Sequence, residues 1–274
     1  MTLEGKLPDF IIAGIEKSGT TSMFVNLSKH PQIEMTPNAL EYMKSGLLDN
    51  IKEPHFFNKR WSNGLDWYRG LFNDNDKLQG EAASNYLFNQ EYIKRMASIV
   101  PHARIIVSLR NPVTRAYSQY SYFKEFYRKS MAAALSRFES NKTLFLKIAK
   151  LRNISFDEAI KDEIKKGVIL GEGFIGKGFY MDLIENLLKH YPRQQVLFII
   201  SEQMKKDMQG TYQRLFEFLG LEDYPINFDR DVLVSPKDKE MDVSTQECLR
   251  GIYHSSNERL FQFLGGRVPE WEMR

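Results

Sequence analysis

The chain of 274 residues contains a single cysteine, Cys248. One cysteine excludes a disulfide within the chain, and this scarcity is typical of proteins in a reducing compartment. We therefore expect a cytoplasmic protein. Cys248 falls in a helical pattern with Leu249 and Ile252, which predicts an inert, packed thiol.

The chain also lacks a long apolar run and a strong excess of one charge. The apolar stretch at residues 10–15 is far shorter than the roughly 20 residues that cross a bilayer, and Met1–Asp9 does not resemble a signal peptide. The formal net charge of +3 is too small to indicate nucleic-acid binding. We expect a soluble protein with no membrane and no nucleic-acid partner, either alone or as one domain of a larger polypeptide.

Short apolar runs alternate with longer helical patterns along the chain. Strands that alternate with helices predict an α/β fold, with a mainly parallel sheet flanked by helices in a single domain over residues 1–274. The expected strands are residues 10–15, 104–109 and 196–200, and the expected helices are residues 20–29, 112–127, 155–166, 178–190 and 209–219.

Two segments fit this alternation poorly, namely residues 128–176 and the charged residues 229–243. Ligands of an open parallel sheet bind beyond the carboxyl ends of its strands, where long loops contact substrates. We therefore expect residues 128–176 to form a lid or an acceptor-binding insertion over the active site.

The first expected strand runs directly into a glycine-containing turn that opens a helix. The backbone N–H groups of such a turn and the helix dipole bind phosphate, and a lysine adds positive charge. An ordinary turn with a solvated lysine is the alternative, but the density of hydrogen-bond donors favours an anion site. The predicted anion-binding residues are Lys17, Ser18, Gly19, Thr20, Thr21 and Ser22.

This turn differs from the nucleoside-triphosphate loop G-x-x-x-x-G-K-[ST], because Thr20 follows the second glycine where that motif has lysine. The strand at residues 104–109 is followed by Arg110, a cation where such an enzyme needs a carboxylate near its magnesium. We therefore predict an anion site without a metal. A metal-dependent kinase is the weaker alternative.

A second phosphate contact is predicted at Arg110, with Ser118 eight residues later on the following helix. The arginine fork can bind a phosphate through two parallel hydrogen bonds, and the serine hydroxyl can add a third. Arginine at a strand end is also often solvated or paired with a carboxylate. The phosphate interpretation therefore depends on the first loop.

With these two motifs in this order, the sequence resembles the nucleotide-dependent sulfotransferase family. Residues 17–22 resemble its 5′-phosphosulfate loop, and Arg110 with Ser118 resembles its 3′-phosphate motif. The resemblance implies a P-loop-type sheet and the co-substrate 3′-phosphoadenosine-5′-phosphosulfate, which leaves as 3′-phosphoadenosine-5′-phosphate. It also implies that Lys17 neutralises charge on the leaving oxygen and that no metal takes part.

Residues 52–57, Lys-Glu-Pro-His-Phe-Phe, resemble the branch that includes the heparan sulfate sulfotransferases. The resemblance implies that Glu53 is the catalytic base and that His55 orients the acceptor or the sulfate. We expect a strand here, whose alternation puts Glu53 and His55 on one face while Phe56 and Phe57 contact the core. An edge strand with solvent-facing polar residues is the alternative, and which of the two residues is the main base stays open.

Several features depart from the glycan-modifying members of that branch. Asn58 stands where they tend to have Asp, and residues 80–86 lack their usual proline at position 85 and a nearby basic residue. A similar signature occurs in sulfotransferase domains of bacterial polyketide and olefin synthases, which sulfate the β-hydroxyl of an acyl chain on a carrier protein. We expect that acceptor, with a glycan hydroxyl as one alternative and a non-catalytic nucleotide-binding module as another.

Overall fold

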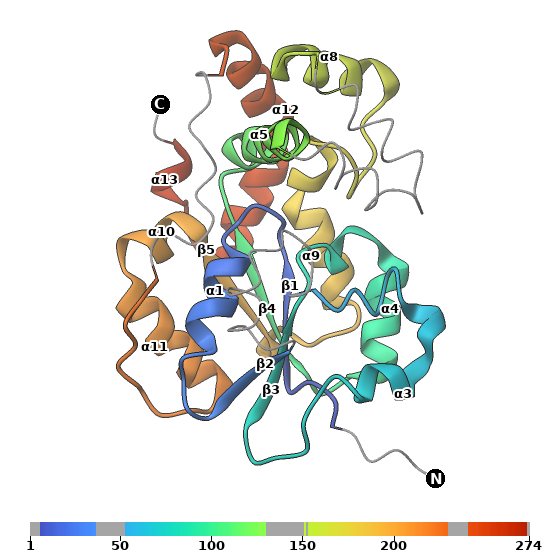
Figure 1. Cartoon of the computed structure of the whole chain (residues 1–274). Helices are drawn as coiled ribbons and strands as arrows, with labels where there is room; N and C mark the ends of the chain where they lie inside the picture. The colour runs from blue at the N-terminus through green and yellow to red at the C-terminus, as the bar shows by residue number, and fades with distance from the viewer. Residues whose placement is uncertain (1–5, 37–52, 130–150, 152, 230–240, 273–274) are drawn as a thin grey trace. The chain divides into compact units, whose positions relative to one another are not determined.

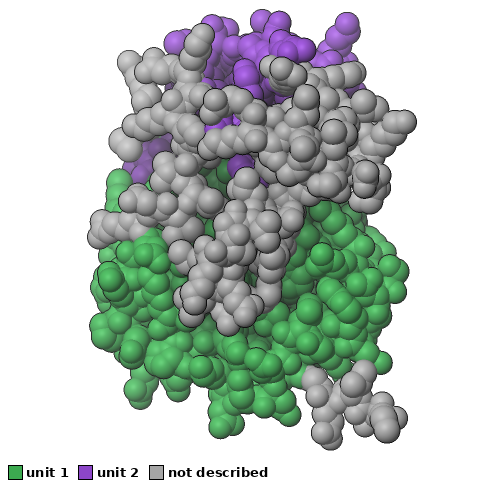
Figure 2. All heavy atoms as spheres, in the orientation of Figure 1, with its two compact units in different colours: residues 1–110, 183–233, 272–274 green, residues 111–182, 234–271 purple. Residues whose placement is uncertain are grey.

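The computed structural model describes residues 6–36, 53–129, 151, 153–229 and 241–272. The chain divides into two compact units, which Figure 2 distinguishes by colour. Unit 1 consists of residues 1–110, 183–233 and 272–274, and unit 2 consists of residues 111–182 and 234–271. The single domain over residues 1–274 stays a prediction.

Unit 1 contains a five-stranded sheet in the order β2-β3-β1-β4-β5, in which all neighbouring strands are parallel. The predicted α/β class is therefore confirmed, as are strands at the three predicted positions. Two further strands, β2 and β3, were not predicted, because both contain polar residues and neither forms an apolar run. The strands are β1 (Phe10–Gly14), β2 (Ile33–Thr36), β3 (Leu78–Ala82), β4 (Arg104–Leu109) and β5 (Val196–Ile200).

Helices cover both faces of this sheet (Figure 1). On one face lie α1 (Thr20–Leu27), α10 (Ser201–Lys206) and α11 (Met208–Leu219); on the other lie α3 (Gly64–Arg69), α4 (Gln90–Ile99) and the part of α9 (Tyr180–Leu188) that begins at Leu183. The core buries Phe24 of α1 and Leu215 of α11 against Ile12 of β1. Gly220 ends α11 in the left-handed conformation with φ of 71°.

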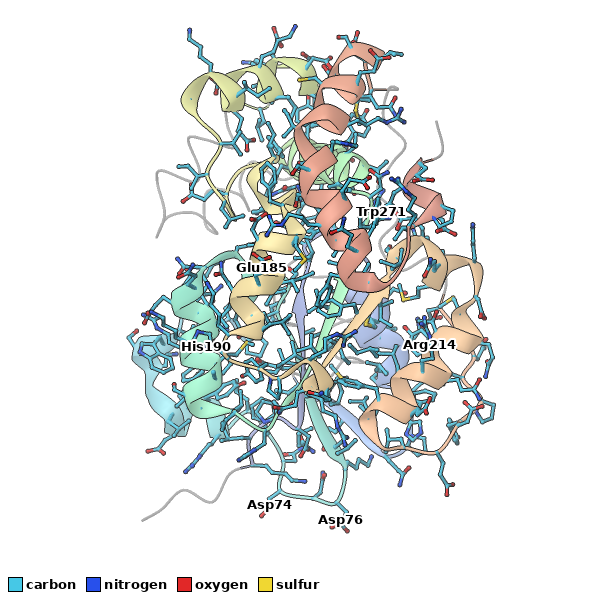
Figure 3. The ribbon with its side chains drawn as sticks, turned by 180° about the vertical axis from the view of Figure 1, so that it is seen from behind. Asp74, Asp76, Glu185, His190, Arg214 and Trp271 are labelled. Atoms are coloured by element: carbon cyan, nitrogen blue, oxygen red, sulfur yellow. The ribbon has the colours of Figure 1, made fainter. Side chains whose placement is uncertain are left out.

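Short 3-10 turns connect some of these elements, at Trp61–Asn63 (η1), Tyr86–Phe88 (η2) and Arg193–Gln195 (η4). Asp74 and Asp76 lie in the turn that precedes β3, and they mark the amino edge of the sheet (Figure 3). The carboxyl ends of all five parallel strands therefore lie at the opposite edge.

Unit 2 is helical in the residues that the structure describes. It contains α5 (Pro112–Lys129), α8 (Phe156–Lys166), α12 (Val243–Leu264), the 3-10 turn η3 (Gly176–Gly178) and the part of α13 (Pro269–Glu272) that ends at Trp271. Its core packs Tyr120, Phe156 and Leu249 together. A capping box formed by Ser155 and Glu158 begins α8, which confirms the predicted helix there.

The expectation of a packed thiol at Cys248 is wrong, because this cysteine is exposed. Its neighbour Leu249 is fully buried, and successive residues of an α-helix point about 100° apart, so Cys248 is turned toward solvent.

Much of the predicted lid, residues 130–150 and 152, lies outside the described residues, as do residues 230–240 of the second irregular segment. The lid therefore stays a prediction. Within the described ranges, no helix combines the length and apolar character that a membrane span requires.

Candidate active site

Four chain segments meet at the carboxyl edge of the sheet. The predicted phosphate loop follows β1, Ser84 and Asn85 follow β3, Arg110 follows β4, and α10 follows β5. This edge is where parallel α/β sheets bind ligands.

The phosphate loop has a backbone suited to an anion. Lys17 and Gly19 both have positive φ, 69° and 90°, and left-handed residues within a turn direct successive N–H groups into one concave surface. A side chain on Gly19 would also meet the Met204 methyl group at 3.1 Å. The N–H of Ser18 is already used, since it donates to the Ile15 carbonyl at 3.1 Å. The donors at residues 19–22 therefore remain the main candidates for the anion.

The Ser18 side chain fits a bound oxyanion. Its hydroxyl is fully buried and has no hydrogen-bond partner among the described residues. The Ser18 carbonyl accepts a hydrogen bond from the hydroxyl of Ser108 on β4, which holds the loop against the sheet. A buried hydroxyl without a partner costs free energy unless a ligand completes it, and a phosphate oxygen could do so.

Two more cations lie beside this loop. Arg110 donates from Nη1 to the Lys17 carbonyl at 3.1 Å. Lys205 of α10 is exposed as a residue, yet partial desolvation of its ammonium group and the positive charge of Arg110 both lower its pKa. The sequence reasoning missed Lys205, although its position just after a buried strand was a usable signal.

The structure places Arg110 in unit 1 and Ser118 in unit 2. Ser118 is buried within α5. The joint action of these two residues on one phosphate therefore stays a prediction.

Glu53 and His55 are brought together, but by a turn. His55 Nε2 lies 3.6 Å from Glu53 Oε2, and both residues are at most 7% exposed. The expected strand is wrong: His55 has φ of 54°, and its carbonyl accepts the N–H groups of both Lys59 and Arg60 at 3.0 Å. Because Pro54 lacks an N–H group, it also suits a strand poorly. The alternative of solvent-facing polar residues is wrong as well.

Ser84 holds the other oxygen of this carboxylate. Its hydroxyl donates to Glu53 Oε1 at 2.8 Å in a buried pair. The sequence reasoning treated residues 80–86 only as a departure from a family pattern and did not assign a role to Ser84. A polar residue just beyond the end of β3 could have signalled one.

The two asparagines that depart from the family pattern contact each other. Asn58 Nδ2 donates to Asn85 Oδ1 at 3.0 Å, and Asn85 forms an isolated β-bridge with Gly14 at the end of β1. Residues 84–85 therefore link the loop that carries Glu53 and His55 to the start of the phosphate loop.

The aromatic residues next to the pair anchor its loop. Phe56 and Phe57 are at most 1% exposed, which confirms the predicted core contact. The Phe56 ring stacks on Tyr68 with 4.2 Å between centroids, and the Phe57 ring meets Tyr86 edge-on at 5.2 Å. The site thus combines a loop whose backbone suits an anion with a buried carboxylate and a buried imidazole. No cluster of three or more metal-ligating side chains occurs in the described part of the chain.

A family model described as the sulfotransferase domain matches residues 7–262. The chain is 25% identical over 291 residues to bifunctional heparan sulfate N-deacetylase/N-sulfotransferase 1 of Caenorhabditis briggsae, with 97% of this chain and 31% of that protein covered. It is 27% identical over 218 residues to heparan sulfate glucosamine 3-O-sulfotransferase 6 of Mus musculus, with 79% and 53% covered. The chain therefore spans only about a third to a half of the length of these relatives.

Among solved structures, the chain is similar to a sulfotransferase from Alicyclobacillus acidocaldarius, with a TM-score of 0.70 and 23% identity. The match covers 98% of this chain and 100% of that one. At this identity the likeness shows a shared fold, that of a parallel sheet flanked by helices.

We predict that Ser84→Ala destabilises the protein by about 1.5–3 kcal/mol, the usual worth of a hydrogen bond to a charged group. Urea unfolding measures this loss. Ser121→Ala is the control, because its hydroxyl is also buried but has no hydrogen-bond partner among the described residues. Equal losses in both variants would contradict the role of the Ser84 hydrogen bond.

Proposed function

The chain belongs to the sulfotransferase domain family, and from this membership we propose that it transfers a sulfuryl group from 3′-phosphoadenosine-5′-phosphosulfate to an acceptor hydroxyl. One observation carries the proposal. The anion-binding loop after β1 and the buried Glu53–His55 pair lie at the same edge of one sheet, linked through Ser84 and Asn85.

The donor is held mainly by the loop and the cations beside it. The N–H groups of residues 19–22 and the Ser18 hydroxyl bind the 5′-phosphate, for which the unpartnered hydroxyl of Ser18 is the structural support. Arg110 binds the 3′-phosphate, and Lys205 adds a second positive charge close to it. Ser118 keeps the role that its spacing from Arg110 predicts.

The chemistry is a direct in-line transfer. The acceptor oxygen forms a bond to sulfur while the bond from sulfur to the 5′-phosphate oxygen breaks. Glu53 takes the acceptor proton, and the Ser84 hydroxyl holds its carboxylate in place. His55, whose Nε2 lies 3.6 Å from Glu53 Oε2, orients the acceptor or the sulfate. Lys17 neutralises the charge that develops on the leaving phosphate oxygen.

For the acceptor we propose the β-hydroxyl of an acyl chain on a carrier protein. Ala82 and Ala83 are fully buried, and Ser84 is engaged with Glu53, so this stretch offers no cation to a polyanion where the glycan-modifying members have a basic residue nearby. A glycan hydroxyl is the second candidate, because the matched curated relatives are named as heparan sulfate enzymes.

We predict that 3′-phosphoadenosine-5′-phosphate raises the melting temperature much more than AMP does, because Arg110 and Lys205 bind the extra phosphate. A ligand at one hundred times its Kd adds about 2.7 kcal/mol to the free energy of unfolding. Arg110→Ala should abolish the difference between the two nucleotides. Lys205→Ala should reduce it, whereas Lys206→Ala, at the next position of α10, should leave it unchanged.

The melting temperature is measured by thermal unfolding with each of the two nucleotides and with ATP plus magnesium. Equal shifts for the adenosine bisphosphate and AMP would refute the donor assignment. A larger shift with ATP and magnesium would favour the kinase.

Glu53→Gln keeps the shape of the side chain but removes the base, so we expect kcat to fall by roughly 10²–10⁴-fold. Donor affinity should hardly change, because the donor is held by other elements. Single-turnover rates and nucleotide titration separate the two quantities. If Glu53→Gln keeps its full rate while His55→Ala does not, His55 is the base.

The acceptor is tested by offering a β-hydroxyacyl carrier protein, the same acyl group on a small thioester, and a heparan oligosaccharide. We expect mass spectrometry to find one added sulfate on the carrier-bound acyl chain. Sulfation of the oligosaccharide alone would establish the glycan acceptor and leave the donor chemistry intact.

A further inference from the structure

One buried carboxyl group near the site has no role in the mechanism above. Glu81 lies within β3, where it pairs with Ile11 of β1 on one side and Thr36 of β2 on the other. The residue is completely inaccessible to solvent. Burying an ionised carboxylate without a partner costs much free energy. The group must therefore either keep its proton or be stabilised by neighbouring hydrogen-bond donors.

Tyrosines surround this carboxyl group. The hydroxyls of Tyr68, from α3, and Tyr86, from η2, approach it without reaching ideal hydrogen-bond geometry. Burial raises the pKa of Glu81 to about 8, the two hydroxyls oppose this, and the charge of Glu53 raises it further. Burial raises the pKa of Tyr191, which follows α9, and the negative charge of Glu81 raises it as well. Near neutral pH, Glu81 is therefore mostly a neutral acid.

The same two tyrosines support the loop of residues 53–57, named the base loop from here on. Tyr68 stacks on Phe56 with an interplanar angle of only 6°, and Tyr86 contacts Phe57. The backbone of Phe57 and Phe56 also faces the Tyr86 hydroxyl. Burial raises the pKa of both tyrosines, so they stay neutral. Tyr68 and Tyr86 thus lie between Glu81 and the base loop, so a change in the charge of Glu81 acts on the loop through these two rings.

We propose that Glu81 is a positioning residue for the base loop: its neutral carboxyl group fixes the Tyr68 and Tyr86 rings on which the loop packs, and its ionisation displaces them. Loss of its proton would put a second negative charge beside Glu53 in a region without solvent. The two hydroxyls would then turn toward the carboxylate and away from their places against the base loop. The consequence for catalysis rests on the proposed sulfuryl transfer, whereas the displacement itself does not.

The sign of the pH dependence follows from the raised pKa. Between about pH 4.5 and pH 8, the unfolded chain has lost the Glu81 proton and the folded protein has kept it. Stability from this group is therefore complete below the unfolded value and falls as the pH rises through this window. Glu81→Gln cannot ionise, so its stability should depend less on pH there.

The displacement is tested by tryptophan fluorescence, because Trp61 and Trp67 lie against Phe56 at centroid distances of 5.3 and 6.2 Å. Titration from pH 6 to pH 9.5 should show a transition near pH 8 in the unaltered protein and none in Glu81→Gln. Tyr68→Phe, which removes one hydroxyl that favours ionisation, should move the transition to higher pH. Glu34→Gln, on β2, is the matched control and should retain it.

A transition that persists unchanged in Glu81→Gln, or that does not move in Tyr68→Phe, would overturn the proposal. If Glu81→Gln does not fold, the shift expected in Tyr68→Phe still decides the test.

The catalytic consequence is measured as kcat against pH with the acceptor that is turned over. We expect kcat to decline above pH 8 in the unaltered protein and to stay level in Glu81→Gln, with the affinity for 3′-phosphoadenosine-5′-phosphate equal in both. The same alkaline decline in both proteins would refute a positioning role. If no acceptor is sulfated, the proposed function fails, while the fluorescence titration still decides the inference on Glu81.

Discussion

The parallel register of β1 between β3 and β4 positions the segments of the candidate site. Ile12 pairs with Ala82 on one side and with Ile106 on the other, so the three strands end at nearly the same level. Their backbone hydrogen bonds and their mostly buried side chains hold this register against slippage, since a shift by one residue would turn every side chain to the opposite face. Each functional segment begins where one of these strands ends.

The order of the strands separates the cationic residues of the site from its carboxylate. The phosphate loop follows the central strand β1, the cations Arg110 and Lys205 follow β4 and β5, and Ser84, which holds Glu53, follows β3 on the other side. The positive charges and the carboxylate of Glu53 therefore lie on opposite sides of one loop. This separation would keep the proposed base from repelling the proposed anionic donor at close range.

Two residues of the candidate site have a strained backbone conformation. Lys17 and His55 are the only residues other than glycine with positive φ in the part of the chain that the structure describes. Such a conformation costs on the order of 1–3 kcal/mol and persists only where neighbouring contacts enforce it. The Lys17 carbonyl accepts from Arg110, and the His55 carbonyl accepts two N–H groups. Both residues were proposed from the sequence as catalytic, and strain at functional residues is common.

The elements with a local signal could be predicted from the sequence alone. Continuous apolar runs located β1, β4 and β5, and the glycine, lysine and hydroxyl residues between β1 and α1 indicated an anion site. The strands β2 and β3 were missed because Glu34, Gln79 and Glu81 interrupt their apolar character. Three relations became known only from the folded chain: a turn joins Glu53 to His55, Ser84 donates to the Glu53 carboxylate, and Lys205 and Glu81 lie close to the site. Those relations join residues that are distant in the chain or lie on an unexpected turn, and spacing along a sequence does not encode which strand ends become neighbours in a sheet.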